Sequence, residues 1–360
     1  MAHILSDRQA TWLWRLGKVG VAAGVVWLLL QQGALDMDLL WAGSIHLPIV
    51  AVALLCNLVM ISLGAVRWFI LLDSQEIRLP FAWVHRMTYL TVCFNLLVPG
   101  SIGGDALRMG YLIRQSGDDQ KGAAILTILA DRLTGLYSLF ALALLASLAN
   151  LPIMLEQLPT RLLVLSLALA VLGGPLLALL LFWVAERLPS PRPPTEGTTA
   201  LKRWWQTALL QTVRSARLFR RTIGHLLSAV LVSALAQTVE IVALLWIAQQ
   251  LGLLTAPFDH FFVAAPVAWL ANLLPLSPGG LGVGEAAFAQ VCQWLQPAAA
   301  LTALSTPFLI NRMVQIVASL PGLWVYLTYR STHAANTFQV AGGPGGIIPP
   351  GGVSGRSPDM

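Results

Sequence analysis

The sequence predicts an all-α polytopic membrane protein, an inverted repeat of six spanning helices plus two re-entrant helical hairpins from opposite faces. Three observations predict this fold class. The 360 residues are 57% hydrophobic and only 11% charged, whereas soluble domains carry about 25% charged residues. The apolar stretches are long and continuous, unlike the short alternating segments of a membrane barrel. Two Gly/Pro-rich loops, at 95–108 and 272–286, interrupt this pattern in the same way half a protein apart.

Six apolar segments are long enough to cross the roughly 30 Å hydrocarbon core of a bilayer. They are residues 12–34, 46–71, 121–149, 161–185, 223–251 and 298–328. Because no small-residue cleavage site follows the first segment, we expect an uncleaved helix rather than a signal peptide. In such a protein the net charge of +6 indicates cytoplasmic loops that face anionic lipid, and not a nucleic-acid partner.

The two halves of the chain match in register. Five pairs occur in the same order, each 177 to 180 positions apart: Pro80 and Pro257, Asn95 and Asn272, Pro99 and Pro278, Asp105 and Glu285, and Arg132 and Arg312. A nearly constant offset over five pairs indicates an internal duplication. Duplication is the usual plan of secondary transporters.

The placement of Lys and Arg predicts that the second copy is inverted relative to the first. The loops 150–160 and 252–257 contain no Lys or Arg, so we expect them outside, whereas the basic linker 186–222 is inside. Both flanks of region 81–116 are then inside, and both flanks of region 258–296 are outside. Each region enters and leaves by the same face, which makes it a re-entrant hairpin.

The predicted organisation has four parts. They are a first membrane repeat at 1–185 with hairpin 81–116, a basic cytoplasmic linker at 186–222, a second membrane repeat at 223–330 with hairpin 258–296, and a disordered cytoplasmic tail at 331–360. The linker is expected to contact anionic inner-leaflet lipid. The protein is expected in a bacterial-type inner membrane with both termini in the cytoplasm.

The hairpin tips are predicted to contact the transported molecule. Irregular backbone at membrane depth is tolerated only where protein buries it or water reaches it. Helix N-termini there expose N–H groups that bind anions, and glycine allows the backbone to approach a ligand closely. The tip residues expected to bind substrate are Gly103, Gly104, Ser277, Gly279 and Gly280.

Arg132 and Arg312 lie mid-helix at equivalent positions, where a charge is costly and functional by default. One interpretation is that both guanidinium groups hold one lipid phosphate through their planar forks. The other is internal pairing, of Arg132 with an acid and of Arg312 with the hairpin backbone. Asp131 points about 100° away from Arg132 on a helix, so we expect it to pair with another helix or to take up a proton.

The intramembrane acids have two interpretations. Asp105 and Glu285 each follow a Gly-rich turn, where they are expected to cap the outgoing helix, with proton or cation coupling as the alternative. Arg108 lies three residues after Asp105, so the two are expected to pair, or Arg108 meets a headgroup at the cytoplasmic face. Glu240 lies inside the fifth span and requires a cationic partner, for which Arg312 and Arg132 are the candidates.

The remaining polar residues are given structural roles. Arg67, followed by Trp68, is interpreted as a snorkelling cation beside an aromatic anchor at the cytoplasmic interface. His85 and His260 have no ligand spacing, and neither have the three cysteines, so no metal site and no cofactor are expected.

Three strings carry a resemblance to a known family: FNLLVPGSIGGDALRMGYL, DRLTGLYSL and LSPGGLGVGEAAF. They resemble the flippase-like membrane region of lysylphosphatidylglycerol synthases, over about residues 10–330. The resemblance implies movement of lipid between leaflets, in some members of aminoacylated phosphatidylglycerol. We find no soluble aminoacyltransferase domain in the sequence, so we expect a stand-alone member that does not make the aminoacyl lipid itself.

The predicted function is transport, and not catalysis, of a phospholipid or polyprenyl-phosphate lipid with an anionic headgroup. The alternative is an integral-membrane enzyme or accessory factor that acts on a polyprenyl-phosphate or a lipid-linked sugar. An enzyme needs its acids on one face of the membrane. Asp105 and Glu285 belong to hairpins expected from opposite faces, which favours transport.

Overall fold

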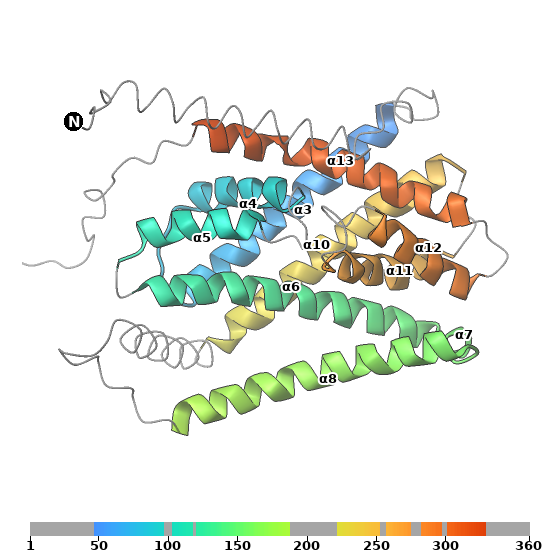
Figure 1. The fold of residues 1–360 in the computed structure, drawn as a ribbon, viewed down its shortest axis with the longest axis horizontal. Coiled ribbons are helices and arrows are strands. Elements are labelled where there is room, and N and C mark those ends of the chain that lie inside the picture. The colour runs from blue at the N-terminus through green and yellow to red at the C-terminus, as the bar shows by residue number, and fades with distance from the viewer. Residues whose placement is uncertain are drawn as a thin grey trace, which may run out of the picture. The chain divides into compact units, whose positions relative to one another are not determined.

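The computed structural model describes residues 47–96, 103–117, 120–187, 222–252, 257–274, 282–296 and 301–328. The regular elements in these ranges are all helices, and they belong to one compact unit (Figure 1). The helices are α3 (Leu47–Asp73), α4 (Phe81–Asn95), α5 (Gly103–Gln115), α6 (Lys121–Ala149), α7 (Leu151–Met154), α8 (Leu158–Arg187), α10 (Ile223–Gln250), α11 (Phe258–Ala271), α12 (Val283–Leu295) and α13 (Leu301–Thr328).

Five of these helices are long and apolar enough to cross a membrane, namely α3, α6, α8, α10 and α13. They coincide with five of the six predicted spans, which confirms an all-helical polytopic membrane protein. The first predicted span, 12–34, lies outside the described residues. The same holds for most of the basic linker, 188–221, and for the whole tail, 331–360.

The most exposed of the long helices is α8, which packs against α6 and α7 within the described part of the chain. Its exposed side chains are mostly leucines, among them Leu165, Leu169 and Leu172. A continuous apolar surface of this kind is suited to hydrocarbon and not to water. This helix therefore presents a lipid-facing side.

Two sets of four helices make matching contacts. In the first set α3 packs on α4 and α6, α4 on α5, and α5 on α6; in the second α10 packs on α11 and α13, α11 on α12, and α12 on α13. Between the sets, α3 packs on α10, the α4–α13 contact is matched by α11–α6, and the α3–α13 contact by α10–α6. Exchanging the two sets leaves this pattern of contacts unchanged.

Each Gly/Pro-rich region is a pair of short helices. The pairs α4/α5 and α11/α12 consist of helices of 13 to 15 residues, about 20–23 Å each and too short to span a bilayer. In Figure 1, α4/α5 lies toward one end of the long helices and α11/α12 toward the other. The tips, 97–102 and 275–281, lie outside the described residues, and with them Ser277, Gly279 and Gly280.

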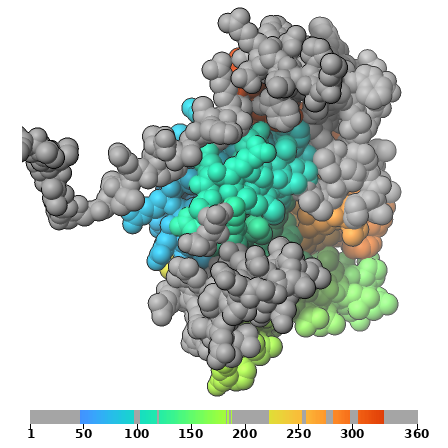
Figure 2. Space-filling model, turned by 60° about the vertical axis from the view of Figure 1, so that its left-hand side comes forward, coloured from blue at the N-terminus to red at the C-terminus, as the bar shows by residue number. Residues whose placement is uncertain are grey.

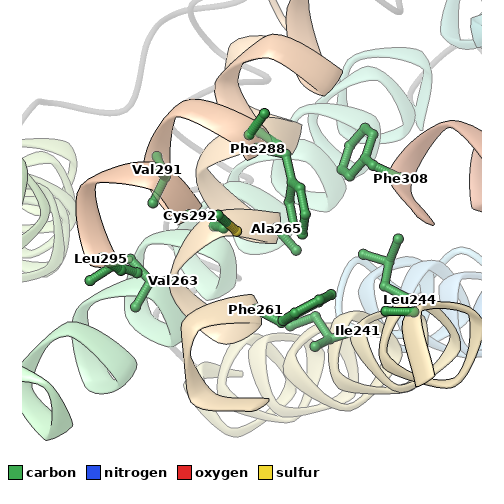
Figure 3. Close-up of a cluster of buried hydrophobic side chains, with 14 of the residues drawn as sticks. Ile241, Leu244, Phe261, Val263, Ala265, Phe288, Val291, Cys292, Leu295 and Phe308 are labelled. Atoms are coloured by element: carbon green, nitrogen blue, oxygen red, sulfur yellow. The ribbon is translucent and has the colours of Figure 1, made fainter. Parts of the chain in front are cut away.

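Aromatic packing holds the second pair of short helices in place. Phe261 of α11, Phe288 of α12 and Phe308 of α13 form a buried row whose successive ring centroids are 5.3 Å apart, the first pair edge to face and the second tilted. Ile241 and Leu244 of α10 close this cluster (Figure 3). The position of α12 relative to α10 and α13 is therefore set by close-packed side chains.

The first pair packs against a different core. Trp68 of α3, Met87 of α4 and Leu112 of α5 are fully buried in one cluster. Figure 2 shows the turquoise part of the chain, α5 and the beginning of α6, at the surface of the helical unit. The guanidinium of Arg108 on α5 lies over the ring of Trp68.

Candidate functional site

Five charged side chains on three helices form a chain of alternating sign, which we call the first charge cluster. Its members are Arg67 of α3, Asp105 and Arg108 of α5, and Asp131 and Arg132 of α6. Asp131 accepts from Arg67 Nε at 2.6 Å and from Arg108 Nη2 at 3.0 Å. Asp105 lies 3.2 Å from Arg108 Nη2 and accepts from Arg132 Nε at 2.5 Å. The cluster therefore joins the first short-helix pair to two spanning helices.

Arg108 is the buried centre of this cluster. Its side chain is 2% exposed, and its guanidinium lies 4.3 Å from the ring centroid of Trp68. The predicted pairing with Asp105 is found, but burial keeps Arg108 from a headgroup in this conformation. Two carboxylates and an aromatic face replace the water that a lone guanidinium would need.

The interpretation of Arg67 as a snorkelling cation is wrong. Arg67 pairs with Asp131 and also donates from Nη1 to Ser233 of α10 at 3.0 Å. Trp68 is fully buried beneath Arg108 and is not an interfacial anchor. A snorkelling arginine keeps its charged head in water, whereas the guanidinium of Arg67 contacts Asp131 and Ser233.

Counted over the residues that the structure describes, the first charge cluster carries one surplus positive charge, since three arginines face two aspartates (3 − 2 = +1). Its most accessible member is Arg132, whose side chain is 34% exposed. Leu129, which lies three residues before Arg132 on α6, is 52% exposed, and Leu133, the next residue after Arg132, is 56% exposed. The accessible cation therefore lies at the edge of an apolar surface stripe.

A second charge cluster lies in the other half of the protein. It consists of Glu240 on α10, Glu285 on α12, and Arg312 and Gln315 on α13. Arg312 Nη1 donates to Glu285 Oε1 at 2.8 Å, and Gln315 Nε2 donates to Glu240 Oε1 at 3.2 Å. The charge of Arg312 also acts on Glu240. All three ionisable side chains are buried.

The two acids at the helix starts behave differently. Glu285 caps α12 as the sequence predicts, since its Oε2 accepts the backbone N–H of Gly282 at 2.9 Å. Asp105 lies in the first turn of α5, but its carboxylate contacts Arg108 and Arg132. Both acids interact favourably with the positive N-terminal end of their helix dipole. Only Glu285 also accepts a hydrogen bond from a backbone N–H at that end.

Equivalent residues of the two halves make equivalent contacts. The pairs Asp105–Arg132 and Glu285–Arg312 both join residues 27 positions apart, from the second short helix to the long helix after it. The N–H of Gly104 donates to Asn95 Oδ1 at 2.8 Å. At the matching place, a Cβ on Gly284 would overlap the side chain of Asn272. Sequence offset and local geometry therefore agree.

Sequence reasoning missed several polar partners. Gln315 follows Arg312 by three positions, so a search of the same helix face would have found it. Ser233 gave no signal, because a serine in a spanning helix ordinarily donates to a backbone carbonyl of its own helix, as Ser233 also does to Ala229. Asn311, the counterpart of Asp131, accepts from Asn57 Nδ2 at 3.1 Å. Among the described residues, no group of three or more His, Cys, Asp or Glu side chains is suited to a metal ion.

Comparison with known proteins places these features in one family. The family described as lysylphosphatidylglycerol synthase TM region matches residues 15–322. The chain belongs to this family. The match contains both charge clusters and both pairs of short helices. Membership in the lysylphosphatidylglycerol synthase TM region family is consistent with a lipid-related function in the membrane. A comparison with curated proteins gave no match.

Proposed function

We propose that this protein moves a lipid with an anionic, phosphate-bearing headgroup between the leaflets of a bacterial-type inner membrane. The observation that carries the proposal is the surplus positive charge of the first charge cluster, whose accessible member, Arg132, borders the exposed leucines of α6. A lipid that enters laterally from the bilayer places its hydrocarbon chains against these leucines and its phosphate beside Arg132. Phospholipids and polyprenyl-phosphate lipids share this chemistry.

The first charge cluster is built so that Arg132 can exchange partners. When a phosphate takes the guanidinium of Arg132, Asp105 keeps Arg108 as its second cation at 3.2 Å. Asp131 keeps both Arg67 and Arg108. Neither Asp105 nor Asp131 is therefore left without a cation, which is the costly outcome when an ion pair opens. A singly charged phosphodiester also neutralises the cluster.

The second charge cluster is not suited to the same exchange. If Arg312 left Glu285 for a phosphate, Glu285 and Glu240 would both be left without the cation that acts on them. The prediction that Arg132 and Arg312 together hold one phosphate is therefore narrowed in our proposal. Arg132 binds the headgroup phosphate first, and Arg312 remains the cation of Glu285 and Glu240.

The transport path in this proposal is an inverted repeat with re-entrant hairpins α4/α5 and α11/α12. The matched contacts of the two helix sets support it, as do the equivalent ion pairs and the distribution of Lys and Arg. Inverted repeats allow one half to rock against the other and expose a central site to each side in turn. Labelling of cysteines with an impermeant reagent tests the orientation: Gln157→Cys should react from outside intact cells and Ser190→Cys should not.

Lipid movement is tested with the full chain in proteoliposomes that contain a fluorescent anionic phospholipid in one leaflet. Wild-type protein should speed its appearance in the other leaflet. Arg132→Ala should slow this by about tenfold or more, since a hydrogen bond to a charged group contributes about 1.5–3 kcal/mol. Arg132→Lys should recover only part of the wild-type rate, because lysine lacks the planar fork of the guanidinium group.

The exposed Arg161 at the start of α8 provides the matched control, and Arg161→Ala should move lipid at the wild-type rate. Each variant is compared at equal reconstituted amount and after its thermal stability in detergent has been measured. Wild-type protein that leaves the lipid where it was would contradict transport. A stable Arg132→Ala protein with the wild-type rate would remove Arg132 from the headgroup site.

A further inference from the structure

The second charge cluster holds one more acid than it has cations. Glu240 and Glu285 share one guanidinium, that of Arg312. If both acids were ionised, this group of side chains would carry a net charge of −1 (1 − 2). The first charge cluster has the opposite surplus. An uncompensated anion inside a membrane protein is costly and marks a functional position by default.

The two acids do not share Arg312 equally. Glu285 uses both of its oxygens: Oε1 accepts from Arg312 at 2.8 Å and Oε2 accepts from the Gly282 backbone at 2.9 Å. Glu240 has the amide of Gln315 on Oε1 at 3.2 Å. Among the described residues, no cation lies within the 4.0 Å ion-pair distance of its carboxylate. Glu240 is therefore the surplus acid.

Within the described ranges, the other charged groups near α10 do not compensate Glu240. The helices that pack against α10 are α3, α6, α11 and α13. Their charged and titratable residues, with the other one of α10 itself, are Cys56, Arg67, Asp73, Lys121, Asp131, Arg132, Tyr137, His225, Asp259, His260, Arg312 and Tyr326. Of these, Arg312 is the one whose charge acts on Glu240, and Arg67 is held by Asp131 and Ser233.

We propose that Glu240 is the proton-binding group of the transport cycle and that its ionisation draws Arg312 away from Glu285. This inference rests on the proposed lipid movement and adds a coupling ion to it. In the protonated form the Glu240 carboxyl is neutral, and Arg312 is paired with Glu285. On release, the O–H bond breaks, the electron pair stays on the carboxylate and the proton passes to water. Two anions then compete for one guanidinium.

That competition reaches the second short-helix pair directly. Glu285 connects Arg312 of α13 to the first turn of α12 through Gly282. When Arg312 turns toward Glu240, the link between α13 and the start of α12 weakens. A proton on α10 thus biases two arrangements of the hairpin, which is what a ligand must do to drive a conformational change. The first charge cluster has no such surplus acid and is not expected to respond.

Infrared spectroscopy tests the proton directly and without any transport assay. Reconstituted wild-type protein should show the C=O stretching band of a buried protonated carboxyl group, which disappears as the pH rises. Glu240→Gln should lack this band, and Glu156→Gln, a change of the exposed acid after α7, should keep it. If the band is absent from wild-type protein, or is unchanged in Glu240→Gln, the proposal is overturned.

Gln315→Met is a second variant, useful if Glu240→Gln does not fold. It removes the amide that donates to Glu240 Oε1 while nearly keeping the side-chain volume. A donor to a carboxylate oxygen favours the ionised form, so its loss should move the disappearance of the band to higher pH. An unchanged titration would show that the band belongs to another acid.

Transport measured with and without a proton gradient separates this inference from the function on which it rests. Wild-type protein and Glu156→Gln should move anionic lipid faster when a gradient is imposed, and Glu240→Gln should lose that response. Wild-type protein that moves lipid equally with and without a gradient would overturn coupling but leave lipid transport standing. Wild-type protein that moves no lipid in either condition would overturn both.

Discussion

The two charge clusters contain the same ion pair in different surroundings. In the first, the Asp105–Arg132 pair is backed by Arg108 and Arg67 and reaches the surface of α6. In the second, the Glu285–Arg312 pair is backed by Glu240, and the Arg312 side chain is 7% exposed. Two sets of helices with matching contacts thus provide one site with spare positive charge and one with spare negative charge. The first is suited to an anionic headgroup and the second to a proton.

The contrast also explains why equivalent positions need not have equivalent roles. Asp131 of the first half corresponds to Asn311 of the second, so the second cluster lacks the acid that anchors Arg67 and Arg108. Glu240 has no charged counterpart in the first half, because position 63 of α3, its equivalent at the offset of 177, is leucine. The sign of the surplus charge differs because Arg67 and Arg108 also correspond to uncharged residues, Leu244 and Phe288, at the offsets of 177 and 180.

Removal of each arginine should show the largest difference between the clusters. Arg312→Ala leaves Glu285 and Glu240 buried without their cation, which should lower the free energy of unfolding by about 3–5 kcal/mol. Arg132→Ala leaves Asp105 with Arg108, and Arg132 is partly exposed, so about 1 kcal/mol or less is expected. Thermal unfolding in detergent measures both.

Rescue by a second substitution is the control for that comparison. Arg312→Ala should regain stability when Glu285→Gln is added, because Glu285 is the direct ion-pair partner. Glu240→Gln should rescue less, since Glu240 has Gln315 as its hydrogen-bond partner. Equal losses of unfolding free energy for Arg132→Ala and Arg312→Ala would mean that the Asp105–Arg132 and Glu285–Arg312 pairs have equivalent surroundings, which would contradict this comparison.

The glycines at the starts of α5 and α12 should show an intermediate difference. A Cβ at Gly104 would overlap the backbone carbonyl of Thr91, whereas at Gly284 it would overlap the side chain of Asn272. Backbone in a packed helix cannot move aside as a side chain can. Gly104→Ala should therefore cost about 3 kcal/mol and Gly284→Ala about 1 kcal/mol, within the range for overpacking. Thermal unfolding in detergent measures both costs. A larger loss for Gly284→Ala than for Gly104→Ala would contradict the geometry.

The stripe beside Arg132 should show the smallest effect. Leu133 is 56% exposed on α6, so Leu133→Ala removes few packed atoms and should change the unfolding free energy by no more than about 0.5 kcal/mol. Leu112→Ala, in the buried core of α5, serves as the contrast and should cost about 2–5 kcal/mol. A large loss at Leu133 would indicate that another surface covers it.

Much of the fold follows from the sequence because its signals are local. Long apolar runs predict five of the described helices, and the Gly/Pro-rich loops predict where the two short pairs are broken. The pairing of Asp105 with Arg108 is also local, since three positions place them on one helix face. The short helix α7, Leu151–Met154, lies in what the sequence predicts as a loop. Its single turn is too short to show a periodic hydrophobic pattern.

The site was harder to predict because its partners are distant in sequence. Arg67 pairs with Asp131 across 64 positions, and nothing in the local pattern of α3 distinguishes this arginine from one that snorkels. Arg132 and Asp105 lie 27 positions apart on different helices. Periodicity identifies the helix face of each charge, but only packing shows which faces meet.

Selectivity for headgroup charge tests the central claim most directly. The rate of movement between leaflets is measured for an anionic phospholipid and for an uncharged lipid with the same chains, in wild-type protein, Arg132→Gln and the control Arg161→Gln. The account predicts that wild-type protein and Arg161→Gln favour the anionic lipid and that Arg132→Gln loses this preference. An unchanged preference in stable Arg132→Gln protein would contradict it.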